Sequence, residues 1–315
     1  MNEFEMIAKY FAPLSLDGLR DDGVVLDVPR GHELVVSTDM LNEGVHFWQN
    51  EEPRYIAQKA LRVNLSDLAS MGAHPLYYQL ALGLPKGTDE AWIARFSAAL
   101  AEEQRLFSIQ LSGGDTTGTH GPLSLSITVM GVVPKGKAVR RGGAKVGDVL
   151  AITGCVGDAY IGLQILRGDL ESEHEAHFLE RYRVPHPRCN LSDLLHAHVH
   201  AAADISDGLL ADAGHIALAS DLKAVIEMER VAFSPQADGL LVGGQVSVLE
   251  LLAGGDDYEL VMAVSADEFS IFQQAAAERG VQVQAVGRFE AGTGLEVLDG
   301  RGQKLEIENT GWRHF

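Results

Sequence analysis

Five short segments place aspartate beside glycine, serine or threonine, and their oxygen atoms are the groups in this sequence most suited to binding metal ions. The segments are Asp21-Asp22-Gly23, Ser37-Thr38-Asp39, Asn64-Leu65-Ser66-Asp67, Gly113-Gly114-Asp115-Thr116-Thr117 and Asp204-Ile205-Ser206-Asp207-Gly208. Mg²⁺ prefers oxygen ligands and commonly binds one or two carboxylates together with phosphate oxygens and water. Single aspartates on separate segments therefore indicate several Mg²⁺ ions around a triphosphate rather than one protein cage.

Asp67 is the best single ligand candidate, because it lies in a helical pattern among Leu65, Leu68 and Met71. A carboxylate among apolar residues costs free energy unless it is paired or bound to metal. The segment 113–117 adds glycine amides, a carboxylate and two hydroxyls, which together suit the binding of phosphate and metal. Each segment taken alone is also ordinary turn or N-cap chemistry, so the interpretation depends on their combination.

Phosphoryl transfer is the chemistry that this pattern favours. It requires mainly positioning of the reactants and neutralisation of charge, which metal ions at the ends of structural elements supply without a covalent nucleophile. The chain has no Walker-type GxxxxGK[ST] segment and no HRD or DFG kinase segment. The common nucleotide-binding folds are therefore disfavoured.

Alternating strands and helices must position these segments. In the first half we expect a strand at 33–37 that opens into a turn at 38–39, helices at 56–71 and 90–107, a turn at 113–117 and a strand at 123–133. In the second half we expect strands near 149–154, 224–228 and 258–264, helices near 160–166, 191–203, 247–254 and 269–280, and a hairpin at the C-terminus. This alternation predicts an α/β (α+β) protein with two domains, each a mixed sheet covered by helices.

The boundary between the two halves is expected near residue 140. The segment 134–148 is rich in glycine and basic residues, as connections between domains often are. We therefore divide the chain into domains 1–138 and 139–315. The sequence Gly-Gly-Asp occurs in both halves, at 113–115 and 254–256, which would fit a duplicated architecture.

Composition and charge exclude several classes of protein. The net charge of −19 opposes nonspecific binding to nucleic acid and to anionic membranes. The chain has only two cysteines, Cys155 and Cys189, too few for a disulfide framework or a four-thiolate zinc site. The N-terminal residues lack a signal-peptide pattern, and no apolar run reaches the roughly 18 residues of a membrane span. We expect a cytoplasmic protein without nucleic-acid or membrane partners.

Eight segments, taken in order along the chain, resemble the motifs of the bacterial thiamine-monophosphate kinases. They are RDDGVVLD, STDMLNEGVHF, KALRVNLSDLASMGAHP, GGDTT, RRGGAKVGD, DISDGLLADAGHI, GGDDYEL and GWRHF. That family belongs to the superfamily related to aminoimidazole ribonucleotide synthetase. The resemblance implies a two-domain fold of that type, with residues 1–138 binding ATP and Mg²⁺ and forming a homodimer. It also implies phosphorylation of thiamine monophosphate to thiamine diphosphate by direct in-line transfer from ATP with several Mg²⁺ ions.

The same resemblance implies roles for individual residues. The magnesium positions are Asp22, Ser37, Thr38, Asp39, Asp67, Asp115, Asp204 and Asp207, of which Asp67 and Asp115 are the catalytic pair. The ATP positions are Gly114, Asp115, Arg141 and Ser206, and the thiamine phosphate positions are His46, Asp256 and Trp312. The planar fork of Arg141 suits phosphate, and the Trp312 ring suits stacking on a flat heteroaromatic ring. Taken alone, Arg141 is typical of solvated surface and Trp312 of a packing residue.

The sequence departs from the family pattern at two positions. Arg20 stands where the family often has glycine, which changes the turn before Asp22. Asp256 stands where the family often has glutamate, which keeps a carboxylate but shortens its reach by one methylene. The thiamine contact at Asp256 therefore depends more on local geometry than the magnesium positions do.

Some chemically suggestive residues are better explained without function. His196, His198 and His200 would share one face of a strand, but the surrounding leucine and alanine residues favour a helix, on which residues two apart diverge. The charged run 171–180 is typical of a solvated helix face. Cys155 has no base nearby in sequence, so we interpret it as a packing residue.

Two alternative functions remain. One is another activity of the same superfamily, such as a selenophosphate synthetase, a hydrogenase-maturation dehydratase or a purine-pathway synthetase. Selenophosphate synthetases resemble one another in a reactive cysteine or selenocysteine near the N-terminus, and the hydrogenase-maturation protein has a C-terminal cysteine tail. The cysteines here are at 155 and 189. The other is a noncatalytic metal-binding protein, whose melting would depend on Mg²⁺ without any ATP turnover. Scattered aspartates disfavour that alternative, because they do not form one cage.

Overall fold

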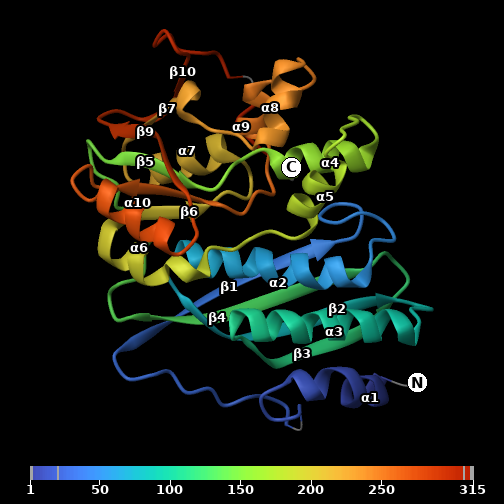
Figure 1. Ribbon diagram of the computed structural model, residues 1–315. Coiled ribbons are helices and arrows are strands. Elements are labelled where there is room, and N and C mark those ends of the chain that lie inside the picture. Colours follow the sequence, from blue (N-terminus) through green and yellow to red (C-terminus); the bar gives the residue numbers. More distant parts are fainter. Residues whose placement is uncertain (1–2, 20, 308, 313–315) are drawn as a thin grey trace. The chain divides into compact units, whose positions relative to one another are not determined.

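The computed structural model describes residues 3–19, 21–307 and 309–312 (Figure 1). The chain divides into two compact units, the first formed by Met1–Leu68 and Ala73–Gly136 and the second by Ala69–Gly72 and Lys137–Phe315. Arg20 and the last three residues of GWRHF (313–315) lie outside the described residues.

The described part of the first unit is a four-stranded mixed sheet with helices. Its strands have the order β1-β4-β2-β3; β2 and β3 are parallel, and the other two pairs are antiparallel. The strands are β1 (His32–Asn42), β2 (His74–Pro85), β3 (Gln110–Thr119) and β4 (Ser124–Pro134). The helices are α1 (Glu3–Met6), a π-helix (Ile7–Phe11), a 3₁₀-helix (Ala12–Leu14), α2 (Pro53–Ser70) and α3 (Glu90–Phe107).

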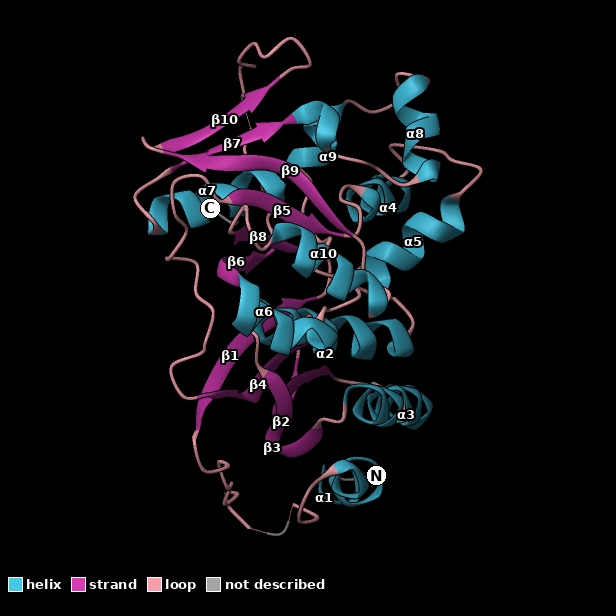
Figure 2. Cartoon of the chain, turned by 60° about the vertical axis from the view of Figure 1, so that its left-hand side comes forward, coloured by secondary structure: helices cyan, strands magenta, loops and turns pink. Residues whose placement is uncertain are grey.

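Helices α2 and α3 lie on the same side of this sheet in Figure 2. Helix α3 begins at the N-cap Asp89, whose side chain accepts a hydrogen bond from the Trp92 amide, and it ends at the left-handed residue Ser108. Arg62 of α2 donates to both carboxylate oxygens of Glu103 of α3, at 2.7 and 3.0 Å. Both residues are buried, so this ion pair fixes how the two helices pack.

Strand β1 shows that the sheet has a covered and an uncovered face. Val35 and Leu41 are 6% and 2% exposed, whereas Leu34, Val36 and Met40 are between 44% and 58% exposed. Successive side chains of a strand point to opposite faces. The odd-numbered side chains of β1 therefore lie on the covered face and the even-numbered ones on the other.

Two expected turns of the first unit are strands, which corrects the sequence analysis. Residues 38–39 lie within β1, where Thr38 pairs with Thr128 and Asp39 with Ile127. Residues 113–117 lie within β3 and pair with 79–83 of β2. Glycine and aspartate are depleted in strands, but pairing with neighbouring strands overrides this weak local preference.

The described part of the second unit contains a six-stranded sheet in the order β10-β7-β9-β5-β8-β6. The β10–β7 pair is parallel, and the other pairs are antiparallel. The strands are β5 (Val149–Thr153), β6 (Val199–Asp204), β7 (Lys223–Glu227), β8 (Leu260–Val264), β9 (Val283–Glu290) and β10 (Gly294–Leu298). The α-helices are α4 (Asp158–Arg167), α5 (Glu175–Arg183), α6 (Ser192–His198), α7 (Leu209–Ala219), α8 (Pro235–Val242), α9 (Val248–Ala253) and α10 (Phe269–Glu278).

The apolar core of the second unit lies on both faces of its sheet. One cluster joins Ile152 of β5 to Leu209 of α7, and another joins Ala151 of β5 to Leu195 of α6 and Phe272 of α10. Because neighbouring residues of a strand face opposite ways, helices cover the sheet on both sides. The predicted fold class, two domains that each combine a mixed sheet with helices, is confirmed.

The second unit differs from the sequence analysis at one expected helix and contains one helix that was not expected. The helix expected at 191–203 ends at His198, and the residues after it form β6, which pairs with β8. The hairpin expected at the C-terminus is a short one, in which Leu298 and Lys304 form an antiparallel bridge, whereas β9 and β10 are separated by β7. Helix α8 was not expected from the sequence, although its N-cap Ser234 and the following proline are standard helix-start residues.

Within the described ranges, no helix combines the length and the apolar character needed to cross a membrane.

Candidate active site

Three of the predicted magnesium ligands of the first unit lie together between β1 and α2. Ser37 Oγ donates a hydrogen bond of 2.5 Å to Asp67 Oδ2. The Asp39 amide donates to Asn64 Oδ1 at 2.9 Å, so α2 also fixes the backbone of β1 beside Asp39. The odd-numbered residues of β1 face α2, which explains why a strand and a helix contribute to one cluster.

The two carboxylates of this cluster repel each other. Burial, and secondly the charge of Asp67, raise the pKa of Asp39 to about 6. A buried carboxylate beside another carboxylate favours the neutral form unless a cation is present. The oxygen-only ligands of Ser37, Asp39 and Asp67 are those that Mg²⁺ prefers, and the crowding of negative charge suits a bound cation.

The predicted ligand Thr38 lies on the other face of the sheet. Its Oγ1 is 2.8 Å from Thr128 Oγ1 on β4. Thr128 in turn lines a pocket of about 480 Å³ that also contains Asp22, Gly114 and Asp115. The predicted ligands of the first unit thus form two groups, one on each face of its sheet.

This pocket combines acidic and apolar walls. Asp21, Asp22 and Asp115 supply carboxylates, and Phe4 and Phe11 are among its apolar lining residues. Asp22 and Asp115 are exposed, and Asp115 lies on β3 in register with Ala81 of β2, which also lines the pocket. A pocket of this kind can hold a ligand with one charged end and one flat apolar end.

Gly114 is required by the close pairing of β2 and β3. A Cβ atom at this position would collide with the carbonyl oxygen of Leu80. The same atom would meet nothing within 4 Å at Gly118, in the same strand. The glycine of GGDTT therefore keeps the backbone close to β2 and leaves the adjacent Asp115 at the pocket.

His46 lies in the turn that follows β1. Its Nδ1 accepts a hydrogen bond of 3.0 Å from the Asn42 amide, and the His46 amide donates to Asn42 O at 3.0 Å. Since Nδ1 is the acceptor, the neutral ring carries its proton on Nε2. His46 is half-buried, so this contact orients a ring that still reaches the surface.

The second unit presents its predicted ligands on the loop 204–208, between β6 and α7. Asp204 ends β6 and is 3% exposed, whereas Ser206 and Asp207 are half-buried. The amides of Ser206 and Asp207 both donate to Asp212 Oδ2, at 3.1 Å each. Asp212 is 1% exposed, so it serves as a buried anchor for this loop.

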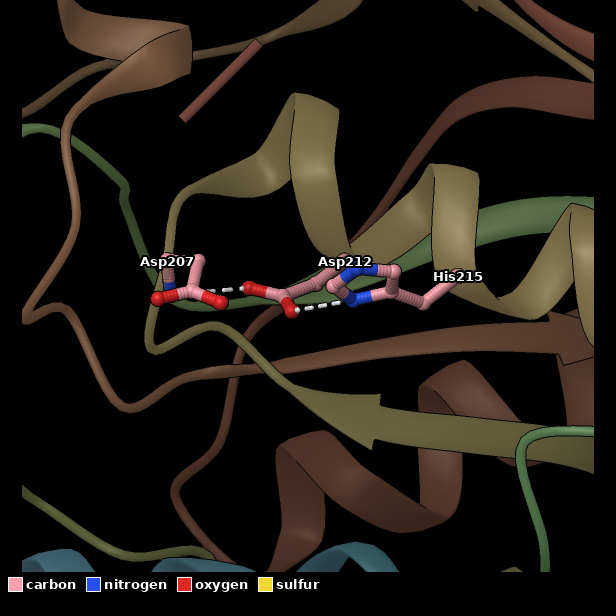
Figure 3. Close-up of side chains that lie close together, drawn as sticks. All are labelled: Asp207, Asp212 and His215. Atoms are coloured by element: carbon pink, nitrogen blue, oxygen red, sulfur yellow. Dashed lines mark hydrogen bonds and ion pairs between the residues drawn. The ribbon is translucent and has the colours of Figure 1, made fainter. Parts of the chain in front are cut away.

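Asp212 also bonds His215, and the two residues form a row with Asp207 in Figure 3. His215 Nδ1 lies 3.2 Å from Asp212 Oδ1, and this hydrogen bond raises the pKa of His215. One possible ligand atom from each of Asp207, Asp212 and His215 lies within 4.8 Å of the others. Asp212 was not predicted as a site residue, although the criterion that selected Asp67, a carboxylate in an apolar helix, applies to it.

Two further segments dock on the same loop. The Asp256 amide donates to Ser206 O at 2.9 Å, and the Trp312 amide donates to Asp207 O at 3.0 Å. The predicted substrate residues Asp256 and Trp312 are thereby brought beside the predicted residues Ser206 and Asp207. Trp312 is 48% exposed, so its ring is available at the surface of the second unit.

Arg141 lies on an exposed loop that is fixed from the end of α7. Ser220 Oγ accepts hydrogen bonds from the amides of Gly143 and Ala144, at 3.2 Å each, and lies 3.5 Å from Arg141 O. The Arg140 carbonyl accepts from the Ala202 amide of β6 at 3.0 Å. The backbone of Arg141 is thus fixed while its side chain is exposed.

His198 and His200, to which the sequence assigned no function, each contact a carboxylate. His198 Nδ1 is 2.7 Å from Glu268 Oε2, and His200 Nδ1 is 2.9 Å from Asp148 Oδ2. His200 lies on β6 rather than on the expected helix. Burial raises the pKa of the Cys155 thiol to about 11, which keeps it protonated and a poor nucleophile at neutral pH.

Comparisons with known proteins agree with the two-domain division. The family model described as AIR synthase related protein, N-terminal domain, matches residues 20–133, and the one described as AIR synthase related protein, C-terminal domain, matches residues 145–300. The thiamine-monophosphate kinase of Caulobacter vibrioides is 43% identical to this chain, over 99% of this chain and 90% of that protein.

Solved structures of thiamine-monophosphate kinases also resemble this chain in fold. The crystal structure of the thiamine-monophosphate kinase of Stenotrophomonas maltophilia K279a has a TM-score of 0.83 and 38% identity, and the match covers 92% of each chain. AaThiL complexed with AMPPCP and TMP has a TM-score of 0.81 and 28% identity, and covers 92% of this chain and 89% of that one.

Proposed function

The chain belongs to the thiamine-monophosphate kinase family, and we propose that it transfers the terminal phosphate of ATP to thiamine monophosphate, giving ADP and thiamine diphosphate. The names of the relatives support this activity, as does the complex of AaThiL with AMPPCP and TMP. The observation that carries the proposal is the cluster of Ser37, Asp39 and Asp67. It places two carboxylates together in a chain already rich in acidic residues.

Mg²⁺ fits this cluster by the chemistry of its donors. The ligands proposed in the first unit are Asp22, Ser37, Thr38, Asp39, Asp67 and Asp115, and those in the second unit are Asp204 and Asp207. When bound, Mg²⁺ would neutralise phosphate charge and help to orient the reacting oxygens. The number of ions is part of the proposal, and the spread of the ligands over several elements supports more than one.

We propose that the phosphates of ATP lie at the edge of the pocket formed by Asp22, Gly114 and Asp115. Because Gly114 has no side chain, backbone groups can approach a phosphate there. Arg141 and Ser206 of the second unit are proposed as further ATP contacts. The guanidinium of Arg141 is exposed and can offer two parallel donors to phosphate oxygens.

We propose that thiamine monophosphate is bound by His46, Asp256 and Trp312. The Trp312 ring is partly exposed beside Asp207, and it can stack on a flat heteroaromatic ring. Asp256 offers a carboxylate on a loop that is bonded to Ser206. His46 can donate from Nε2, because its Nδ1 accepts from the Asn42 amide.

The proposed mechanism is a direct in-line transfer. A terminal phosphate oxygen of thiamine monophosphate forms a bond to the γ-phosphorus of ATP, while the bond from that phosphorus to the β,γ-bridging oxygen breaks and the electron pair leaves with ADP. Asp67 and Asp115 would hold charge-neutralising cations and would not act as nucleophiles. Positioning and charge neutralisation are the main requirements of this chemistry.

The roles of the domains extend the same proposal. Residues 1–138 are proposed to bind ATP and Mg²⁺ and to form a homodimer, and residues 139–315 are the C-terminal α/β domain. The exposed apolar residues Leu34, Val36 and Met40 on the uncovered face of β1 would suit such a dimer. A cytoplasmic location stays a prediction from composition.

A coupled assay for ADP release tests the function. ATP turnover should require both thiamine monophosphate and Mg²⁺, and thiamine diphosphate should appear in equal amount to ADP. Excess chelator should abolish both products, and added Mg²⁺ should restore them. Turnover of an unrelated acceptor without thiamine monophosphate would contradict the substrate assignment. A trapped phosphoaspartate would contradict direct transfer, and Mg²⁺-dependent melting without any turnover would support a noncatalytic metal-binding protein.

A further inference from the structure

The loop 254–259 alternates between residues that reach the surface and residues that are buried. Asp256 and Tyr258 are half-buried, whereas Asp257 and Glu259 are each 1% exposed. Asp256 and Tyr258 also have positive φ angles, of 71° and 52°. Residues other than glycine rarely adopt this conformation, and it persists where the surroundings fix it. Backbone hydrogen bonds of Asp256 and Tyr258, together with the two buried carboxylates, hold it here.

Asp257 is bound to the start of helix α4. Its Oδ2 accepts a hydrogen bond of 2.7 Å from the Gly157 amide, and its Oδ1 accepts one of 3.4 Å from the Ala159 amide. These amides belong to the first turn of a helix, which offers free donors to a carboxylate. The residue that follows Asp256 is therefore attached to a separate element.

Glu259 is bound more strongly, by two arginines and a threonine. Arg188 donates from Nε to Oε2 at 2.6 Å and from Nη2 to Oε1 at 2.5 Å. Arg181 donates to Oε1 at 3.0 Å, and Thr153 Oγ1 donates to Oε2 at 2.6 Å. Burial alone would raise the pKa of Glu259, but Arg188 and Arg181 lower it below the ordinary value. The buried carboxylate is thus charged and fully satisfied.

Backbone hydrogen bonds connect Glu259 to Asp256 and to the loop 204–208. The Tyr258 amide donates to Ile205 O at 2.8 Å, the Ile205 amide donates to Glu259 O at 2.8 Å, and the Asp256 amide donates to Ser206 O. These bonds tie residues 256, 258 and 259 to residues 205 and 206. A shift of Glu259 would reach Asp256 through this short bonded segment.

We propose that Arg188, acting through Glu259, is a positioning residue that sets the affinity of Asp256 for thiamine monophosphate. This inference rests on the function proposed above. Arginine rather than lysine is needed at this position, because its planar fork binds both carboxylate oxygens of Glu259, which lysine cannot do. The shorter reach of aspartate at position 256 makes its contact sensitive to small displacements of the loop. A displacement of about 1 Å at a binding group can cost up to about 100-fold in activity.

The test compares Arg188→Lys with Arg230→Lys in the full-length protein. Arg230 also forms an ion pair, with Glu227 at 2.5 Å, but it is exposed and distant in sequence from every proposed site residue. We expect Arg188→Lys to raise KM for thiamine monophosphate by about 10-fold or more, with KM for ATP changed by less than about 3-fold. Arg230→Lys should change neither value.

A double-mutant cycle separates positioning from a general structural role. If Arg188 acts through Asp256, then Arg188→Lys should raise KM for thiamine monophosphate much less in an Asp256→Ala background than in the wild type. Equal increases in both backgrounds, or an unchanged KM in a folded Arg188→Lys protein, would overturn the inference. Should Arg188→Lys fail to fold by circular dichroism, Arg181→Lys, which loses a single contact to Glu259, replaces it in the same cycle. Wild-type protein without turnover dependent on thiamine monophosphate would instead contradict the proposed function.

Discussion

The two units position their acidic residues in different ways. In the first unit, a strand and a helix bring Ser37, Asp39 and Asp67 together, with a hydrogen bond between Ser37 and Asp67 and repulsion between Asp39 and Asp67. In the second unit, the predicted ligands lie at the end of β6 and in the loop that follows it, and the buried Asp212, outside the predicted set, accepts hydrogen bonds from that loop. The first arrangement contains repulsion that a cation would relieve, whereas in the second the buried Asp212 already has amide and histidine partners. Substitution of these acidic residues should therefore lower activity without lowering stability in the first unit, and lower both in the second.

The largest expected effect is that of Asp67→Asn in the first unit. We expect kcat to fall by at least about 100-fold, because a ligand of a charge-neutralising metal contributes several kcal/mol to lowering the barrier. The free energy of unfolding without metal should stay within about 1 kcal/mol or increase, since the change removes repulsion on Asp39. Steady-state kinetics and thermal unfolding measure the two quantities. Asp238→Asn, at an exposed position of α8, is the matched control, and unchanged kcat in Asp67→Asn would remove Asp67 from the metal set.

Asp212→Ala should give the opposite pattern in the second unit, with activity and stability falling together. The change leaves the amides of Ser206 and Asp207 without their buried acceptor, which costs about 1–3 kcal/mol of unfolding free energy. Loss of the loop geometry should lower kcat/KM for ATP by about 10- to 100-fold. Chemical unfolding and kinetics of the same preparations measure both effects. Asp267→Ala, at an exposed turn, is the control; full stability with lost activity would mean that Asp212 acts as a ligand rather than an anchor.

Gly114→Ala tests how strongly the strand geometry of the first unit limits its site. The added methyl group collides with the Leu80 carbonyl, so we expect a loss of about 1–3 kcal/mol in unfolding free energy and a higher KM for ATP. Gly118→Ala adds the same group to the same strand where nothing lies within 4 Å, and it should have little effect. Isothermal titration calorimetry with an ATP analogue and thermal unfolding compare the two variants. Similar behaviour of the two variants would show that β2 and β3 can separate locally.

The smallest expected effect is a pH dependence of the metal-free protein. The pKa of Asp39 in the folded state, about 6, lies above its ordinary value of 3.8. The folded state therefore binds more protons than the unfolded state between these values. The stability that Asp39 contributes is complete below pH 4 and falls as the pH rises through 6, by on the order of 1–3 kcal/mol.

Thermal unfolding of the wild type and Asp39→Asn in chelator, between pH 4.5 and 7.5, isolates this contribution. As the pH rises, the melting temperature of the wild type should fall relative to that of Asp39→Asn. Mg²⁺ should reverse the trend for the wild type, because the ion binds the charged carboxylate. Parallel pH profiles in chelator would mean that Asp39 has an ordinary pKa.

The sequence predicted the long helices α2 and α3 and several strands from their apolar patterns, but it did not predict β2 or β6. The helix at 90–107 has the predicted bounds, and its start follows from the N-cap Asp89. Errors arose where local preference and pairing disagree. Residues 113–117 favour a turn by composition but are held in a strand by β2, and residues 199–203 favour a helix but pair with β8. Such pairing depends on residues far away in the sequence.

The candidate site was likewise predictable from the sequence only in part. Asp67 was identified because a carboxylate in an apolar helix requires a partner, and the structure gives it Ser37. The same criterion would have selected Asp212, but the sequence cannot tell a buried anchor from a ligand, because the partners of Asp212 are backbone amides of a folded loop. Arg188 and Glu259 are 71 residues apart, so their pairing follows from the fold alone.

The contact between Trp312 and Asp207 has a consequence for the order in which the protein folds. The bond joins two backbone groups separated by more than a hundred positions, and the Glu259 side chain is bound from 71 and 106 positions away. Contacts between distant positions form slowly, because they close large loops of flexible chain. During synthesis, the loop 204–208 emerges long before Trp312 does. The nascent protein can build its sheets early, but the loop gains its last backbone partner only once residue 312 has been made.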